Sequence, residues 1–97
     1  MTKLADKIEA LEGPDRETDH AIHYALGLSG GSKFYTASLD AAMTLVPEQA
    51  VWLVRWAGEE NEAGATVGEG EDYYKAIGKT PALALCAAAL RAREANR

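Results

Sequence analysis

A run of alanine and leucine near the end of the chain sets the tightest limit on how this sequence folds. The stretch TPALALCAAALRAR covers Thr80–Arg93, and every residue from Pro81 to Leu90 is uncharged. A helix that crosses a bilayer needs about 20 such residues, so this stretch is too short to span a membrane. Pro81 suits the first turn of a helix, and Arg91 suits its last turns, where the helix dipole favours cations. We therefore predict a helix whose small side chains pack closely against a neighbour.

The sequence does not decide between two candidates for the neighbour against which this helix packs. One is a sheet formed by the same chain, and the other is the same helix in a second copy. A chain of 97 residues forms one domain around one core. Although 47% of the residues are hydrophobic, many are alanines that bury little area each, so we expect a thin core. A homodimer would add buried surface, and we keep it as a prediction.

Hydrophobic spacing and helix-ending residues predict the other elements. Leu4 and Ile8 lie four residues apart on one side of a first helix, and Gly27 suits the end of a second. Ser38 and Thr80 are expected to cap the starts of the two helices that follow them. We predict helices over about residues 2–12, 14–26, 38–46 and 81–95, and strands over about residues 50–57, 64–68 and 72–77.

The strand predicted from QAVWLVRWAG is the most informative for the fold class. Alternation places Trp52 and Trp56 on one face, which we expect to be the core side, while the other face is apolar apart from Arg55. A strand that is apolar on both faces is usually covered on both sides. We therefore predict an α+β fold in which residues 1–97 form a single domain, with a small, mainly antiparallel sheet of about three strands.

Charge and cysteine content exclude several function classes. A net charge of −5 argues against direct binding to nucleic acid or to an anionic membrane, both of which need a basic patch. Cys86 is the single cysteine, so we expect no intramolecular disulfide and no cysteine zinc site, but a small buried side chain. The opening stretch MTKLADKIEALEG lacks the apolar core of a signal peptide, which favours a cytoplasmic protein. No nucleophile elbow or HExxH motif is present, so no catalytic residue or cofactor is predicted.

Three blocks of the sequence resemble a known family. They are LADKIEALEGPDRETDHAIHYALG (Leu4–Gly27), YTASLDAAMTLVPE (Tyr35–Glu48) and TPALALCAAALRAR (Thr80–Arg93). In this combination and order they resemble the small phage and prophage proteins of the phage ABA sandwich domain family. The resemblance implies an α/β/α sandwich with helices on both faces of the sheet, in a protein that works in the cytosol of a host cell. It carries over no catalytic residue and no cofactor.

An acidic segment is the most suggestive candidate site. It comprises Glu59, Glu60, Glu62, Glu69, Glu71 and Asp72, with no Lys or Arg between Arg55 and Lys75. Three interpretations remain open. The segment is a solvated hairpin and loop, a nucleic-acid mimic that occupies a basic groove on a host enzyme, or a divalent-cation site. The EF-hand pattern of alternating acids before a glycine is not present.

Aromatic and basic residues beside this segment are further candidate contacts for a ligand or partner. Tyr73 and Tyr74 are adjacent in a predicted strand, so they point to opposite faces and one is expected at the surface or at a subunit contact. If the ligand is an anion, we expect Lys33, Arg55, Lys75 and Lys79, and the start of the last helix at Thr80, to be the places where it binds.

Two histidines raise the question of a metal site. His20 and His23 are three residues apart on a predicted helix, a spacing that metal sites between facing helices use. Such a site needs further ligands from elsewhere in the fold, and both histidines lie off the expected buried stripe. We predict no metal site at these histidines.

These features together predict a small, non-enzymatic protein that acts by binding a host protein or a small ligand, including a nucleotide signal of host defence. One alternative is a structural or virion-associated protein that assembles with copies of itself. Another is an acidic mimic that inhibits a host enzyme that binds nucleic acid. We expect neither a membrane nor a nucleic acid as a direct partner.

Overall fold

The computed structural model describes residues 2–58 and 62–95, and these form an α+β fold of four helices and three strands. The elements are α1 (Thr2–Ala10), α2 (Arg16–Leu26), α3 (Leu39–Met43), β1 (Val51–Ala57), β2 (Glu62–Glu69), β3 (Asp72–Gly78) and α4 (Pro81–Ala95). The strands form one antiparallel sheet in the order β1-β2-β3. The α+β class and the small antiparallel sheet predicted from the sequence are thereby confirmed.

Three helix ends carry the capping residues expected from the sequence. The Ser38 side chain accepts a hydrogen bond from the Ala41 N–H at the start of α3, and Thr80 does the same for the Leu83 N–H at the start of α4. Gly27 ends α2 in the left-handed conformation, with φ 63°, which glycine adopts without a steric penalty. Local side-chain chemistry therefore fixes where these helices begin and end.

Some elements differ in length from the sequence prediction. After Met43 the chain continues in tighter turns, in which residues 44–46 donate to carbonyls only three residues earlier. Pro47 then holds Val46 away from helical geometry, so α3 is shorter than expected. In contrast, β2 is longer than expected because its glycines remain within the ladder, and the chain reverses only at Gly70, where φ is 65°.

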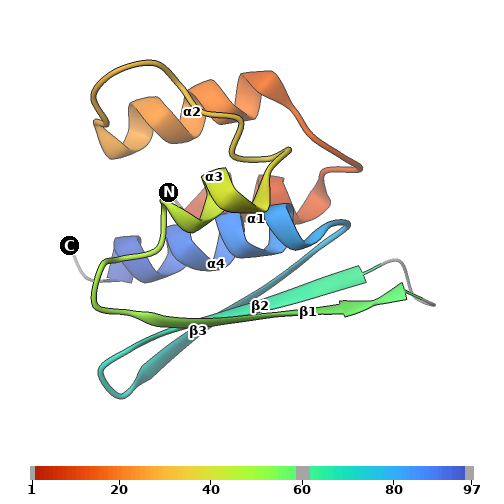
Figure 1. The fold of residues 1–97 in the computed structure, drawn as a ribbon, viewed down its shortest axis with the longest axis vertical. Helices are drawn as coiled ribbons and strands as arrows, with labels where there is room; N and C mark the ends of the chain where they lie inside the picture. The colour runs from red at the N-terminus through yellow and green to blue at the C-terminus, as the bar shows by residue number, and fades with distance from the viewer. Residues whose placement is uncertain (1, 59–61, 96–97) are drawn as a thin grey trace.

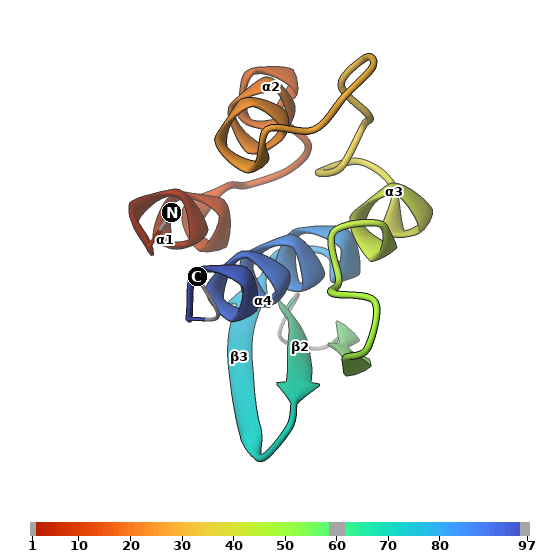
Figure 2. The same cartoon turned by 90° about the vertical axis from the view of Figure 1, so that its left-hand side faces the viewer.

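The helices are stacked on one side of the sheet. Figure 1 shows the sheet at the bottom with α4 directly above it, and Figure 2 shows α1 and α3 on either side of α4 with α2 outermost. α4 packs against β2 and β3 on its lower side and against α1 and α3 elsewhere. The layers therefore run helix, helix, sheet.

α4 forms the centre of the core. Every residue from Ala82 to Leu90 is buried. The sheet meets it with small side chains as well, among them Ala63 and Ala65 of β2, while α1 contributes Ile8. The Ala-rich helix therefore packs on the sheet of its own chain, which is one of the two neighbours that the sequence left open.

The expectation of helices on both faces of the sheet is not met. The described helices all lie on one side, and on the other side Val51 and Leu53 of β1 are 68% and 67% exposed. The physical reason lies in α4, whose apolar surface extends all round the helix. α1 and α3 cover the sides of α4 that the sheet leaves open, so they do not form a second layer beneath the sheet.

Gly78, the last residue of β3, provides a test of the close contact between the sheet and α4. A Cβ at this position would stand 2.8 Å from the Ala84 backbone nitrogen and 3.0 Å from the Leu83 Cβ. We expect Gly78→Ala to lower the free energy of unfolding by about 1–3 kcal/mol through overpacking, measured by denaturant unfolding. Gly31→Ala is the matched control, since nothing lies within 4 Å of a Cβ there. Equal stabilities for the two variants would contradict the close packing.

Candidate functional site

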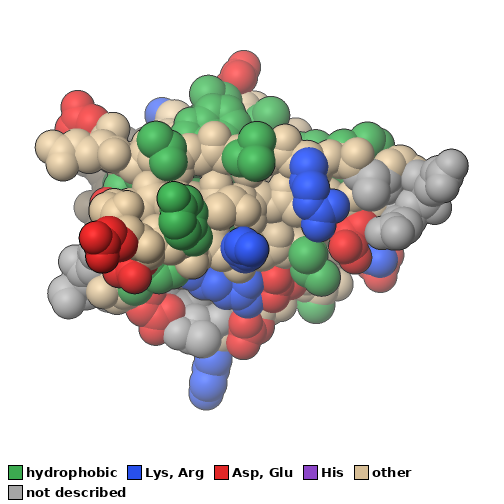
Figure 3. Space-filling view, turned by 90° about the horizontal axis from the view of Figure 1, so that it is seen from below, with side chains coloured by type: hydrophobic (Ala, Val, Ile, Leu, Met, Phe, Trp, Pro, Cys, Tyr) green, Lys and Arg blue, Asp and Glu red, His purple; other side chains and the backbone are tan. Residues whose placement is uncertain are grey.

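The uncovered side of the sheet is the most distinctive surface of the molecule, and we call it the open face. Cross-strand pairing arranges it in three rows, each with one residue from β1, β2 and β3. The rows are Val51–Gly68–Tyr73, Leu53–Thr66–Lys75 and Arg55–Gly64–Ile77. Figure 3 looks onto this side and shows hydrophobic side chains standing apart from one another, with Lys and Arg between them and acidic side chains towards the ends.

Two glycines of β2 allow flat side chains to lie across the open face. A Cβ at Gly68 would stand 2.9 Å from the Tyr73 ring and 3.2 Å from Val51, and one at Gly64 would stand 2.9 Å from the Arg55 guanidinium. Tyr73 and Arg55 therefore lie over the glycine positions rather than standing away from the sheet. Glycine inside a strand is typical of places where another group approaches the backbone closely.

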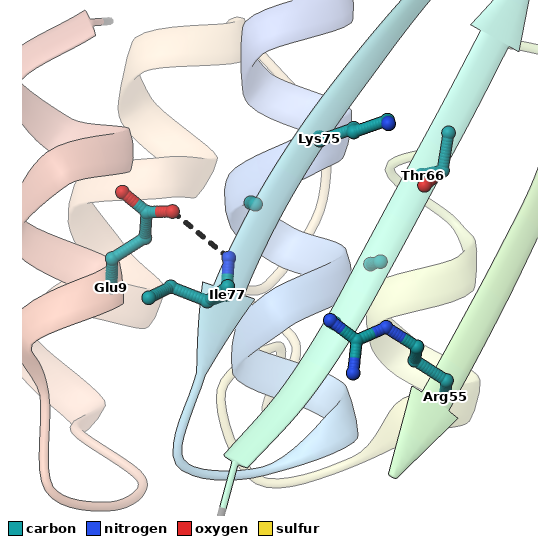
Figure 4. Close-up of a pocket in the computed structure, with 8 residues that line it drawn as sticks. Glu9, Arg55, Thr66, Lys75 and Ile77 are labelled. Atoms are coloured by element: carbon teal, nitrogen blue, oxygen red, sulfur yellow. Dashed lines mark hydrogen bonds between the residues drawn. The ribbon is translucent and has the colours of Figure 1, made fainter. Parts of the chain in front are cut away.

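A hollow of about 400 Å³ lies over the cationic half of the open face. Arg55 of β1 and Lys75 of β3 line it from the two outer strands, with Thr66 of the middle strand between them (Figure 4). A smaller hollow of about 190 Å³ adjoins it through Thr66 and is bordered by Leu53 and Tyr73. The open face thus combines a cationic half with a more apolar half.

On the side of the larger hollow that faces α1, Glu9 and Arg91 form an ion pair, which we call the clamp. The Glu9 carboxylate accepts a hydrogen bond from the Ile77 N–H at 2.9 Å (Figure 4). Arg91 of α4 donates to both Glu9 oxygens, at 2.6 and 2.9 Å, to Asp6 at 2.8 Å and to the Lys75 carbonyl at 2.9 Å. Glu9 and Arg91 therefore join both helices to the outer edge of β3.

This clamp changes the acid–base behaviour of its members. The hydrogen bonds from Arg91 lower the pKa of Glu9, and they outweigh the partial burial that acts to raise it. The same hydrogen bonds raise the pKa of Arg91. Sequence reasoning missed this pair because 82 residues separate its members, and nothing in the local pattern of either helix indicates the contact.

The acidic segment predicted as a candidate site is divided by the fold. Glu62 begins β2, whereas Glu69 ends it, Glu71 lies in the following turn and Asp72 begins β3. The eight residues of β2 separate these two groups by about 23 Å, given a rise of about 3.3 Å per residue. Glu59 and Glu60 lie outside the described residues. The structure therefore does not bring the described acidic residues into one cluster.

The aromatic and basic candidates lie in different places. Tyr73 points into the open face, while Tyr74 points to the helix side and packs against the core. Arg55 and Lys75 both belong to the open face, and Lys79 is exposed in the turn between β3 and α4. Three of the predicted contacts, Arg55, Tyr73 and Lys75, thus share one surface.

The tryptophans lie on the helix side of β1, as the alternation predicts. They are only partly covered there, with Trp52 39% and Trp56 51% exposed. They therefore form a partly exposed aromatic strip along the β1 edge of the sheet rather than a fully buried part of the core.

His23 and Cys86 make hydrogen bonds within the fold, whereas His20 is exposed on α2. One ring nitrogen of His23 is 3.1 Å from the Tyr35 hydroxyl and the other is 3.0 Å from the Gly30 carbonyl oxygen. Within residues 2–58 and 62–95, no three His, Cys, Asp or Glu side chains come together in a way that could hold a metal ion. Burial raises the pKa of Cys86 to about 12, and its thiol donates to the Tyr35 carbonyl. These groups help to hold the fold together.

No protein-family model, curated protein or solved structure matches this chain. The resemblance to the phage ABA sandwich domain family therefore stays a prediction. Among the described helices, none has both the length and the apolarity needed to cross a lipid bilayer.

The lowered pKa of Glu9 predicts how stability depends on pH. The Glu9 carboxylate stabilises the folded state fully above about pH 4.5, the ordinary range for Glu, and this stabilisation is lost as the pH falls through the lower folded-state pKa. We expect Glu9→Gln to be less stable than the wild type at neutral pH and to lose less further stability on acidification below about pH 4.5.

Urea unfolding in a series of buffers from neutral to acidic pH measures this difference. Glu12→Gln is the control, since Glu12 is exposed beyond the end of α1 and the variant should follow the wild-type curve. A Glu9→Gln curve parallel to that of the wild type would contradict the clamp.

Proposed function

We propose that this chain is a small binding protein rather than an enzyme, and that the open face is the surface that meets its partner. The observation that carries the proposal is the exposure of large apolar side chains on a side of the sheet that none of the described helices covers. Val51, Leu53 and Tyr73 are each about two-thirds exposed, and Ile77 is 46% exposed. Large apolar side chains that are exposed singly are ordinary on protein surfaces, but several of them on one face of a small sheet favour an interaction site.

The cations on the open face indicate the chemistry of the partner. Among the described residues, no ion pair joins Arg55 or Lys75 to a carboxylate. A partner that presents carboxylates between apolar side chains would match both halves of the face. The net charge of −5 opposes such a partner at long range, but screening over about 8 Å at physiological salt leaves the local cations to decide the contact.

The residue types on the open face also favour recognition of a protein. Tyr and Arg are enriched among the residues that contribute most to protein–protein binding, and the face offers Tyr73 and Arg55 lying flat on the sheet. Strand spacing and length give the face a planar area of about 330 Å², well below the roughly 800 Å² per partner of a stable interface. We therefore propose a weak, reversible complex with an acidic and apolar segment of a protein, which in the phage setting would be a host protein.

Selection of peptides from a random display library tests this proposal with a defined probe. We expect the enriched peptides to combine Asp or Glu with Leu, Ile or Phe, and to bind in the micromolar range. Leu53→Asp, and separately Arg55→Glu together with Lys75→Glu, should weaken binding at least about tenfold, which corresponds to about 1.4 kcal/mol.

Tyr24→Ser is the matched control, because Tyr24 is 89% exposed on α2 and α2 lies on the far side of the molecule from the open face (Figure 1). This variant should bind the peptides as the wild type does. Absence of enriched peptides, or equal binding by all variants, would overturn the assignment of the open face as the binding surface.

A further inference from the structure

The two edges of the sheet differ in how their backbone groups are satisfied. At the outer edge of β3, Glu9 accepts from the Ile77 N–H and Arg91 donates to the Lys75 carbonyl. These contacts block the edge against another strand, which is how natural proteins protect exposed edges. The opposite edge of the sheet is formed by β1.

The pairing register shows which backbone groups of β1 point outward. Along a strand, the N–H and C=O groups of successive residues point alternately to one side and the other. Because those of Ile77 and Lys75 face away from β2, those of residues 74, 76 and 78 form the hydrogen bonds to β2. Residues 63, 65 and 67 of β2 bond to β3, so residues 64, 66 and 68 bond to β1. Their partners on β1 are residues 55, 53 and 51, whose backbone groups therefore point towards β2. The N–H and C=O groups of Trp52, Val54 and Trp56 therefore point outward. No residue that the structure describes donates to or accepts from them.

The β1 edge also lacks the usual devices that discourage pairing. β1 is seven residues long, VWLVRWA, with no proline, no lysine and a regular ladder to β2. Its one charge, on Arg55, is folded inward over Gly64, away from the edge. The partly exposed indoles of Trp52 and Trp56 flank Val54 along the edge. A long, regular, apolar edge of this kind is a template for a further strand.

We propose that this edge pairs with the same edge of a second copy of this chain, in antiparallel register about a two-fold axis at Val54. The outward-pointing sequence Trp52-x-Val54-x-Trp56 reads the same in both directions, which is the self-complementarity that a two-fold interface requires. Val54 then lies opposite Val54 of the other copy, and each Trp52 lies opposite a Trp56. The three pairs exchange about six backbone hydrogen bonds and produce a six-stranded sheet.

The side chains are compatible with this register on both sides of the sheet. On the helix side, the Trp52–Trp56 pairs cover indole surface that the single chain leaves exposed, and aromatic cross-strand pairs stabilise antiparallel sheets. On the open face, Arg55 of one copy lies opposite Leu53 of the other, so no like charges stand directly opposite each other. This pairing uses the edge of the sheet and does not depend on the open face being a binding surface.

Sedimentation equilibrium over a concentration series, from sub-micromolar to near-millimolar, tests the proposal. The chain has a mass of 10.4 kDa, and we expect the wild type to approach twice that value as the concentration rises. Trp56→Lys places a charge at the edge and should weaken dimerisation at least about tenfold. Circular dichroism and thermal unfolding establish that the variant is folded.

Tyr73→Lys is the matched control, because Tyr73 lies on the open face in β3, at the edge of the sheet opposite β1. This variant should dimerise as the wild type does. A wild type that stays monomeric at every concentration would overturn the proposal, whether or not β1 pairs with a peptide from another protein. A dimer that Tyr73→Lys disrupts and Trp56→Lys does not would place the contact on the open face and would also overturn it.

Oxidative cross-linking tests the register even if Trp56→Lys fails to fold. Val54→Cys should form a covalent dimer, because the two-fold axis brings the new thiols together, while the native Cys86 is fully buried. Trp52→Cys alone should not form a covalent dimer, because the new cysteines of the two copies would lie four residues apart along the paired strands, about 13 Å. Trp52→Cys together with Trp56→Cys should cross-link again. Efficient linking by Trp52→Cys alone, or none by Val54→Cys, would overturn the register.

Discussion

The complete burial of residues 82–90 in α4 is the constraint on which the rest of the structure depends. This part of the helix has no polar side to turn towards water, and each Å² of apolar surface left exposed costs about 25 cal/mol. β2 and β3 cover one side of this helix, and α1 and α3 cover the others. With the helices engaged in that way, the far side of the sheet is left without a helical layer in the part of the chain that the structure describes.

The same packing makes the two edges of the sheet unequal. α1 lies beside α4 on the β3 side (Figure 2), so Glu9 and Arg91 reach the outward-pointing backbone of β3. On the β1 side the neighbouring helix is α3, which is only five residues long, and no described side chain bonds to the edge backbone there. The protection of one edge and the availability of the other thus follow from which helix lies beside each strand.

Features that depend on a few neighbouring residues were predictable from the sequence. The caps at Ser38 and Thr80, the helix end at Gly27 and the alternation of β1 all follow from local stereochemistry, and the structure has each of them. Among the candidate site residues, Tyr73 and Tyr74 point to opposite faces, as any adjacent pair in a strand must.

Features that depend on contacts distant in sequence were not predictable in the same way. Both faces of β1 are apolar, and this pattern does not show whether the second face is covered by the same chain or left for something else. The acidic segment appears continuous in sequence, but β2 runs through it and carries its described members to opposite ends of the sheet. The Glu9–Arg91 clamp joins the first and last helices, and its members carry no mark in sequence that distinguishes them from ordinary surface charges.

The two proposed contacts, one on the open face and one at the β1 edge, are compatible because they involve groups that point in different directions from the same sheet. Strand pairing at β1 uses backbone groups that lie in the plane of the sheet, while the side chains of the open face stand perpendicular to it. Pairing of two copies would join two faces of about 330 Å² into one of about 660 Å², close to the roughly 800 Å² per partner of a stable interface. It would also place two Arg55 and two Lys75 side chains on one surface, so a partner segment would meet more cationic charge than a single chain offers. Self-association at the edge would therefore strengthen binding on the face without any new contact in the site itself.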